Sequence, residues 1–185
     1  MGEQHKKHSR REHLNDFHLN VAGEYVYDGA LYACQSSEEK QHRIKRAVWG
    51  MAAILIVAVI AGGCIPAPGM QNCFYVLLPY LGEFLGAASV IWALAKLGTD
   101  WSAVREYNYK KSVAVLPVRT AVTAVFSLLG IVCELIFFFV NDHAGQTFFA
   151  LLYVLLKLTA LLSALVLRAE IMQAEWDKLP KKDNS

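Results

Sequence analysis

Three ionisable residues that could form ion pairs or exchange protons lie within long apolar stretches of the sequence: Glu83, Glu134 and Lys157. A charge at the centre of a lipid bilayer is costly, so such residues usually face a bundle interior, pair with one another or line a pathway. At a rise of about 1.5 Å per residue, all of them lie roughly 10–16 Å from the nearer ends of those stretches. The sequence therefore predicts a polar cluster in which Lys157 lies within reach of one carboxylate or both.

Two interpretations of this cluster stay open. In the first, the charges are a structural staple that fixes how the helices pack against one another. In the second, they form a ligand-binding or proton-exchange site whose protonation is tuned by burial. Small residues such as Gly82 and Gly86 beside Glu83 allow close approach of helices, and they favour an inward orientation in both cases.

The elements that must position these charges are apolar segments long enough to cross a bilayer. The 185-residue chain is 55% hydrophobic and has a mean hydropathy of +0.31, which is high for a soluble domain. A helix needs about 20 apolar residues to span a bilayer, and it satisfies its own backbone groups in lipid. The predicted spans are residues 47–65, 74–95, 118–140 and 147–167. The predicted fold class is all-α, a polytopic membrane protein with a four-transmembrane-helix bundle.

The basic residues predict the orientation of this bundle. Every Lys and Arg except Lys157 lies before the first span, in the segment from Lys96 to Arg119 that ends at the start of the third span, or after the fourth. Because basic segments are retained in the cytoplasm, we expect a multi-pass protein of the cell membrane with both termini cytoplasmic. These segments would contact anionic lipids of the bilayer, and no nucleic-acid partner is expected. The predicted parts are a cytoplasmic arm over 1–46, a transmembrane domain over 47–168 and a cytoplasmic tail over 169–185.

The N-terminal arm contains a candidate docking element. Asp28-Gly29 lies between short β-favouring runs, which is a strong signal for a two-residue hairpin turn. Such a turn pairs Tyr25 with Tyr32 and places Tyr25, Tyr27 and Tyr32 on one face. An isolated hairpin is marginally stable, so this one would rest on the membrane interface or on a partner protein. An irregular juxtamembrane linker is the alternative.

Local signals also predict where helices begin. Ser36 or Ser37 could cap a helix over residues 36–46 that runs into the first span. Pro117 suits the first turn of the third span.

The connection between the second and third spans allows two arrangements. Thr99 or Asp100 could cap a short helix that carries Trp101 and Val104 on one side. Alternatively, the second span continues past the membrane.

Two cysteines could form a disulfide. Cys64 and Cys73 flank the connection between the first and second spans, on the predicted outer side, where a disulfide is permitted. Free thiols at the ends of the spans are the alternative.

Histidines cluster near the N-terminus, but their spacing fits no common structural zinc pattern. A solvated basic tail is therefore the better interpretation, and no metal is expected. These histidines are His5, His8, His13 and His18.

Motifs for catalysis are missing from the sequence. It contains no phosphate loop, dinucleotide-binding glycine pattern or metalloprotease motif, so no catalytic residue or cofactor is expected. The sequence favours a non-enzymatic integral membrane protein, an accessory, immunity or interaction component that contacts a protein partner or a second copy of itself.

The alternative function is a small proton-coupled transporter that works as an oligomer, because four helices rarely enclose a full pathway. There Glu83 or Glu134 would exchange protons and Lys157 would tune them. An enzyme acting on a lipid or quinone is a more distant interpretation. Four-helix quinone-linked thiol oxidoreductases share only the helix count with this chain, and the lack of Cys-x-x-Cys weakens that resemblance.

Overall fold

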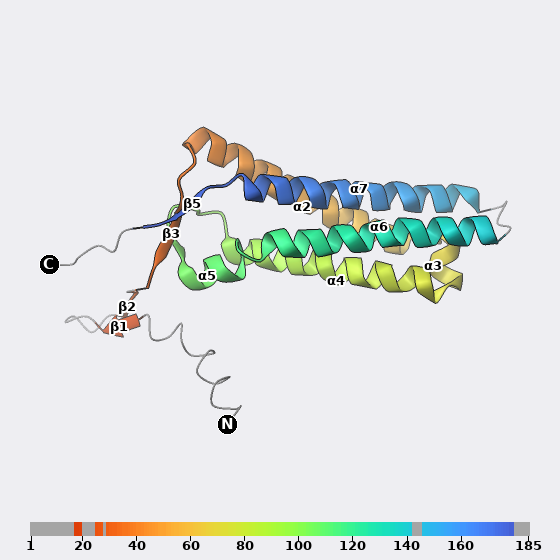
Figure 1. The fold of residues 1–185 in the computed structure, drawn as a ribbon, viewed down its shortest axis with the longest axis horizontal. Helices are drawn as coiled ribbons and strands as arrows, with labels where there is room; N and C mark the ends of the chain where they lie inside the picture. Colours follow the sequence, from red (N-terminus) through yellow and green to blue (C-terminus); the bar gives the residue numbers. More distant parts are fainter. Residues whose placement is uncertain (1–16, 20–24, 28, 142–145, 180–185) are drawn as a thin grey trace, which may run out of the picture.

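Four long helices run side by side in alternating directions in the computed structural model (Figure 1). They are α2 (Glu38–Cys64), α4 (Phe74–Leu97), α6 (Leu116–Val140) and α7 (Thr147–Met172). Each is long enough and apolar enough to cross a membrane, as the hydropathy pattern predicts. The structure describes residues 17–19, 25–27, 29–141 and 146–179.

Local chemistry explains where two of these helices begin. The Ser37 hydroxyl accepts a hydrogen bond from the Lys40 amide at 3.4 Å, and Glu38 and Glu39 occupy the first turn of α2. A hydroxyl cap satisfies an unpaired amide at the helix start, and the carboxylates complement its positive end. Pro117 lies in the first turn of α6. The predicted N-cap of α2 at Ser37 and the predicted place of Pro117 in the first turn of α6 are therefore confirmed.

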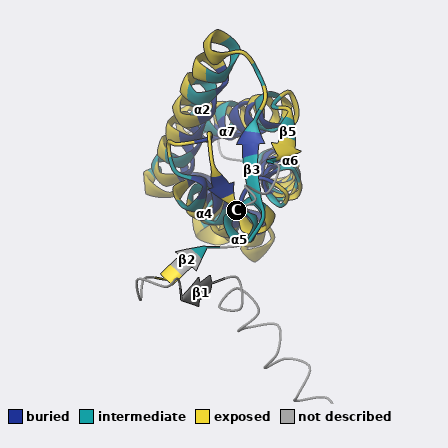
Figure 2. Cartoon of the chain, turned by 90° about the vertical axis from the view of Figure 1, so that its left-hand side faces the viewer, coloured by how far each residue is buried: buried dark blue, intermediate teal, exposed yellow. Residues whose placement is uncertain are grey.

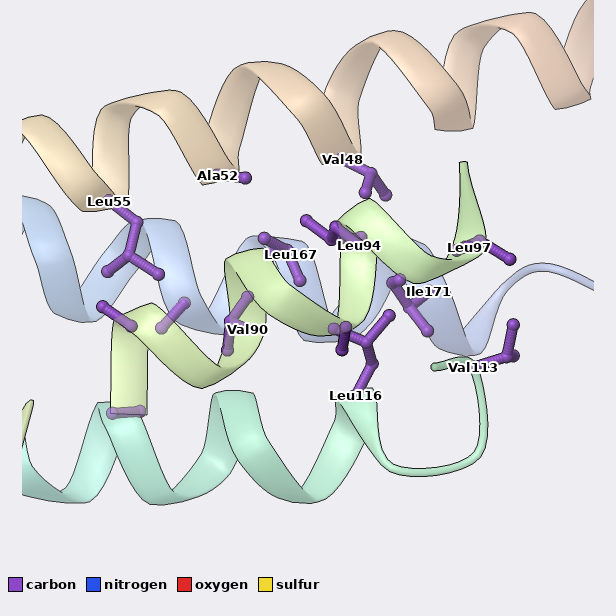
Figure 3. Packing of buried hydrophobic residues seen from close by; sticks show 14 of the residues in the cluster. Val48, Ala52, Leu55, Val90, Leu94, Leu97, Val113, Leu116, Leu167 and Ile171 are labelled. Atoms are coloured by element: carbon purple, nitrogen blue, oxygen red, sulfur yellow. The ribbon is translucent and has the colours of Figure 1, made fainter. Parts of the chain in front are cut away.

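The helices form a closed ring of neighbours. α2 packs on α7, α7 on α6 and α6 on α4, while a smaller contact between α2 and α4 closes the ring. α4 and α7 are therefore diagonal partners, as are α2 and α6. An apolar core lies inside the bundle, where residues from α2, α4, α6 and α7 interdigitate (Figure 3). Labelled members of this core include Val48, Leu55, Val90, Leu94 and Leu167.

The outer surface of the bundle is apolar and its interior contains charges. Large hydrophobic side chains such as Leu85, Phe139 and Leu151 are exposed by 67%, 81% and 64%. The carboxylates and ammonium of the predicted cluster are buried instead. Viewed from one end, buried residues lie toward the centre of the bundle and exposed residues cover the outside (Figure 2). Such an apolar exterior differs from that of a water-soluble bundle, which exposes mainly polar and charged side chains.

A small sheet covers one end of the bundle. Its strands are β3 (Leu31–Cys34), β4 (Val104–Arg105) and β5 (Trp176–Lys178), in the order β4-β3-β5 with both pairings antiparallel. The strands come from the segment before α2, from the connection between α4 and α6, and from the segment after α7 (Figure 1). We call these strands together with α5 (Glu106–Lys111) the cap.

Stacked aromatic rings hold the cap together. Tyr32 lies nearly parallel to Tyr109 with ring centroids 4.2 Å apart, and Trp176 contacts both Tyr109 and Trp101 at 5.7 and 5.5 Å. Trp101 is 1% exposed, and the Lys45 ammonium lies 5.3 Å from its ring centroid. Ring pairs of this kind add to the free energy of burial, so the cap is a packed structure that joins three distant parts of the chain.

The predicted hairpin is wrong. β2 (Tyr25–Tyr27) pairs with β1 (Phe17–Leu19), so that Tyr25 lies opposite Leu19. Tyr32 belongs to β3 and packs on Tyr109, whereas Tyr25 is 76% exposed. The physical reason is that β3 gains hydrogen-bonded neighbours on both edges within the cap, while a two-stranded hairpin would leave one edge unpaired. Asp28 and the histidines at 5, 8 and 13 lie outside the described residues.

Neither arrangement considered for the connection after the second span is formed, whether a short helix starting at Thr99 or Asp100 or a continuation of that span. α4 ends at Leu97, and Asp100 folds back to accept hydrogen bonds from the Ser102 hydroxyl and amide at 2.7 and 3.0 Å. These bonds lower the pKa of the Asp100 carboxyl. The Trp101 carbonyl accepts from the Cys34 amide at 3.0 Å, so pairing with the cap replaces helix formation here. The short helix of this connection, α5, begins later in the chain.

The predicted disulfide is not formed. Cys64 and Cys73 are both free thiols. The connection between them contains the short helix α3 (Pro68–Asn72), which packs against α4 and α6 and buries Pro68 and Gly69. The connection with α3 covers the second end of the bundle. We call this end the α3 end.

Gly98 provides a first prediction. Its φ of 69° and ψ of −166° lie in a region that only glycine adopts readily, and a Cβ there would meet no atom within 4 Å. We expect Gly98→Ala to lower the free energy of unfolding by roughly 1–3 kcal/mol through backbone strain alone. Gly50→Ala is the control, because Gly50 lies within α2 with equally open space, and the change should stabilise by about 1 kcal/mol. Thermal unfolding in detergent would measure both changes in stability. If Gly98→Ala unfolded as the wild type does, the expected backbone strain would be contradicted.

Candidate functional site

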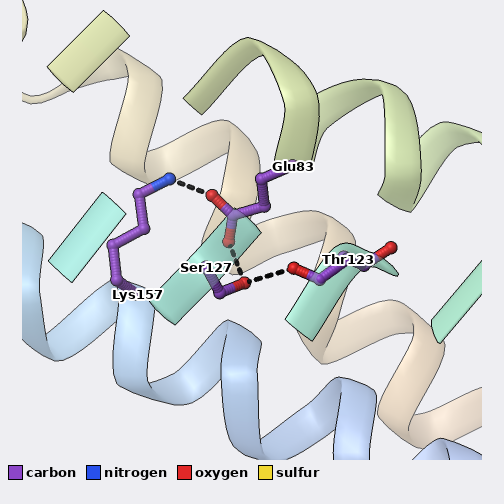
Figure 4. Close-up of polar contacts among 4 residues, drawn as sticks. All are labelled: Glu83, Thr123, Ser127 and Lys157. Carbon is purple, nitrogen blue, oxygen red and sulfur yellow. Dashed lines mark hydrogen bonds and ion pairs between the residues drawn. The ribbon is translucent and has the colours of Figure 1, made fainter. Parts of the chain in front are cut away.

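An ion pair crosses the centre of the bundle. Lys157 of α7 reaches its diagonal neighbour α4, where its Nζ contacts Oε2 of Glu83 (Figure 4). Both side chains are buried. A charge pair that joins diagonal helices opposes sliding of either helix along the bundle, because any shift would separate two charges that have no water to replace their partner.

Neighbouring side chains complete the surroundings of the carboxylate. The Ser127 hydroxyl donates to Glu83 Oε1 at 2.6 Å, with the Thr123 carbonyl oxygen 3.1 Å away as its other acceptor (Figure 4). Each oxygen of Glu83 therefore has a donor, one from α7 and one from α6. A satisfied buried carboxylate is far less costly than a bare one.

Aromatic rings surround the ammonium group. The Lys157 Nζ lies 4.5 Å from the ring centroid of Tyr80 and 5.0 Å from that of Tyr153. Gly130 lies beside the lysine stem, where a Cβ would make an ordinary van der Waals contact of 3.6 Å with Lys157 Cε. The cation thus has one carboxylate and two π faces in place of water.

Glu134 lies apart from this pair, although the sequence places it in the same cluster. Its Oε1 accepts a hydrogen bond from the Gly69 amide of α3 at 3.4 Å. Within the described residues, Glu134 Oε2 and the Tyr153 hydroxyl are buried and have no hydrogen-bond partner. The structure therefore brings Glu83 and Lys157 together and places Glu134 beneath α3.

Gly69 and Tyr80 are site residues that sequence reasoning missed. Gly69 lies in the connection expected to be a plain outer loop, and nothing in its sequence indicates that α3 turns back toward α6. A Cβ at Gly69 would lie 2.2 Å from Glu134 Oε2, so only glycine allows this approach. Tyr80 directly follows Pro79 within an apolar run, a context that does not distinguish it from other aromatic residues.

The inner face of α6 is small and polar along much of its length. Its residues recur every three or four positions, so they share one side of the helix, and all are buried. They are Thr120, Thr123, Ser127, Gly130 and Glu134. The Thr120 and Thr123 hydroxyls donate to carbonyls of their own helix, at 2.9 Å in both cases. This face therefore provides short polar groups to the interior without unpaired hydroxyls between Thr120 and Ser127.

A second candidate site lies at the cap end of α2. A cleft of about 500 Å³ is lined there by side chains of both charges, in which cations outnumber the single carboxylate. The lining residues are Ser37, Glu39, Lys40, Arg43 and Arg46. Lys40 reaches Glu175 at 3.6 Å and Arg43 reaches Gln173 at 3.4 Å, which ties the cleft to the segment after α7. An exposed pair of this kind adds little stability, so these cations remain able to meet an anionic group.

The fold and the site define a class of protein: a four-helix bundle with an apolar exterior, a buried ion pair and a polar cap. Within the described residues, no three His, Cys, Asp or Glu side chains lie close enough together to hold a metal ion. Comparison with protein-family models, with curated proteins and with solved structures finds no match to this chain.

Proposed function

We propose that the bundle is embedded in a membrane, where lipid contacts its apolar outer surface. The support is the apolar outer surface, where Leu, Val and Phe side chains are exposed, while Glu83, Glu134 and Lys157 are buried inside. Exposed aromatic residues also gather at the α3 end, among them Phe74, Tyr75 and Phe148. Such residues are favoured at a membrane–water interface.

The orientation follows from the basic residues. Among the described residues, every Lys and Arg except Lys157 lies toward the cap end. Retention of basic segments therefore favours a cytoplasmic cap, with both termini cytoplasmic and the α3 end outside the cell.

Cysteine labelling tests this orientation. In a variant without native cysteines, Gln71→Cys in α3 should react with an impermeant maleimide added to intact cells, whereas Ser102→Cys beside the cap should not. Both positions are exposed, so burial does not confound the comparison. Reaction at Ser102→Cys before lysis would overturn the orientation.

For the function itself, we propose a non-enzymatic accessory, immunity or interaction component that docks a partner protein at the cap end. The observation that carries this proposal is the basic cleft at the start of α2, built beside a cap that joins three distant chain segments. A bundle needs no such cap merely to span a membrane. The cleft cations favour an acidic segment of the partner, because charge complementarity steers encounter and sets specificity.

Site-specific crosslinking tests the docking surface. A photoreactive amino acid in place of Arg46 should crosslink to one identifiable protein, and the same group in place of Gln71 should not. With purified components, Arg43→Glu should weaken binding about tenfold, equivalent to about 1.4 kcal/mol, and reversing an acidic residue of the partner segment should restore it. Crosslinks from Arg46 to lipid alone, or binding unaffected by Arg43→Glu, would contradict the proposal.

A second candidate function is a small proton-coupled transporter working as an oligomer. The specific observation that favours it is the buried Glu134, whose Oε2 has no partner among the described residues. Proton flux into liposomes would separate the two. An interaction component should give no flux above that of protein-free vesicles, whereas a transporter should give flux that Glu134→Gln abolishes.

A further inference from the structure

Among the described residues, Glu134 is the one member of the charged cluster with no cation beside it. Its carboxyl is fully buried, its Oε2 has no partner among the described residues, and its Oε1 accepts a single long bond of 3.4 Å from the Gly69 amide. Lys157, the nearest ammonium of the cluster, is committed to Glu83. Transfer of an ionised carboxylate to such surroundings is so unfavourable that buried groups usually become neutral instead.

A metal cation would not solve this problem. Hard cations take about six or more oxygen ligands, and the unpartnered oxygens here are those of Glu134 and Tyr153. The ammonium of Lys157, 5.0 Å from the Tyr153 ring centroid, would also repel a second cation. A proton needs only one carboxylate oxygen and adds no net charge to the interior.

Within the part of the chain that the structure describes, other titratable groups near Glu134 do not offer compensation. α3 has none, and those of α4, α6 and α7 toward the α3 end are phenols and thiols, apart from the paired Glu83 and Lys157. The groups facing this region are Tyr75, Tyr80 and Glu83 on α4, Cys133 on α6, and Tyr153 and Lys157 on α7. We infer that Glu134 is a proton-binding site closed by α3. In the folded protein at neutral pH, the Glu134 carboxyl holds a proton.

Infrared spectroscopy of the purified full chain tests this inference directly. A protonated carboxyl absorbs at a higher carbonyl frequency than a carboxylate, and exposed Asp and Glu are ionised at neutral pH. We expect the wild-type protein to retain a protonated-carboxyl band that is lost in Glu134→Gln and kept in Glu83→Gln. Glu134→Asp, which keeps a carboxyl, should shift the band without abolishing it and guards against misfolding of the amide variant.

The results that would overturn the inference are equally specific. Absence of the band in the wild type, or its loss in Glu83→Gln instead, would mean that Glu134 is ionised or that the proton belongs to the ion pair. Loss of the band when Na⁺ or K⁺ is added at constant pH would assign the site to a metal cation.

A glycine variant tests the closure by α3. Gly69→Ala would place its Cβ 2.2 Å from Glu134 Oε2 and 3.0 Å from the Val76 side chain, so α3 or the Glu134 carboxyl must shift and the closure is disturbed. We expect the band to weaken or disappear at neutral pH in this variant, while Gly50→Ala in the open part of α2 leaves it unchanged. A band unaffected by Gly69→Ala would contradict the closure. None of these readouts depends on partner binding, so failure of the crosslinking experiment would leave this inference standing.

Discussion

Replacement of Lys157 by Met should destabilise the bundle by about 3–5 kcal/mol, because it leaves the Glu83 carboxylate buried without its cation. The double variant Lys157→Met with Glu83→Gln should recover most of that loss, since both charges are then gone and the amide can still bond Ser127. Unfolding by denaturant in detergent micelles, followed by circular dichroism, would measure both free energies.

The matched control for this experiment is Lys157→Met with Glu134→Gln. Glu134 contacts the Gly69 amide and has no ion pair with Lys157 in the structure, so this combination should bring no recovery. Recovery with Glu134→Gln in place of Glu83→Gln would show that the lysine pairs with α6. If Lys157→Met left the free energy of unfolding unchanged, a stabilising role of the ion pair would be contradicted.

The same variants address the role of the ion pair. If the double variant with Glu83→Gln recovers both stability and biological activity, the charges act only as a staple between α4 and α7. If it folds but remains inactive, a proton-exchange or ligand-binding role for the pair is favoured.

Trp101→Ala should have the second large effect. Trp101 is 1% exposed, packs on Trp176 and lies under the Lys45 ammonium, so truncation removes the centre of the cap. Large-to-small changes of a buried Trp typically cost about 3–5 kcal/mol. Because Cys34 packs against the core cluster that contains Trp101, we also expect faster alkylation of Cys34 in a variant that keeps no other cysteine.

Trp92→Ala provides the control for the cap. Trp92 is 63% exposed on α4, and the Lys96 ammonium lies 5.4 Å from its ring centroid. Its loss should change the free energy of unfolding by no more than about 0.5 kcal/mol and should leave Cys34 alkylation unchanged. Equal effects of the two tryptophan variants would argue against a packed cap.

Features of this chain that depend only on residues close together in the sequence, such as where a helix begins, were predictable from the sequence. The N-cap of α2 at Ser37 and the start of α6 near Pro117 follow from how a hydroxyl or a proline fits the first helical turn. Strand pairing was not predictable in this way. Asp28-Gly29 favours a turn between its neighbours, but β3 finds partners far along the chain, in β4 and β5, because these bury Trp101 and Trp176 together.

By itself, the sequence determined that four apolar helices form and that three charged residues fall within them, because hydrophobic length and charge position are properties of single segments. Only the tertiary structure decided which carboxylate Lys157 meets. Glu83 and Glu134 are equivalent by depth, and the choice depends on the diagonal placement of α4 and α7 and on the inward fold of α3, which brings the Gly69 amide to Glu134. These are contacts between distant segments, set by how the helices pack, and no local pattern encodes them.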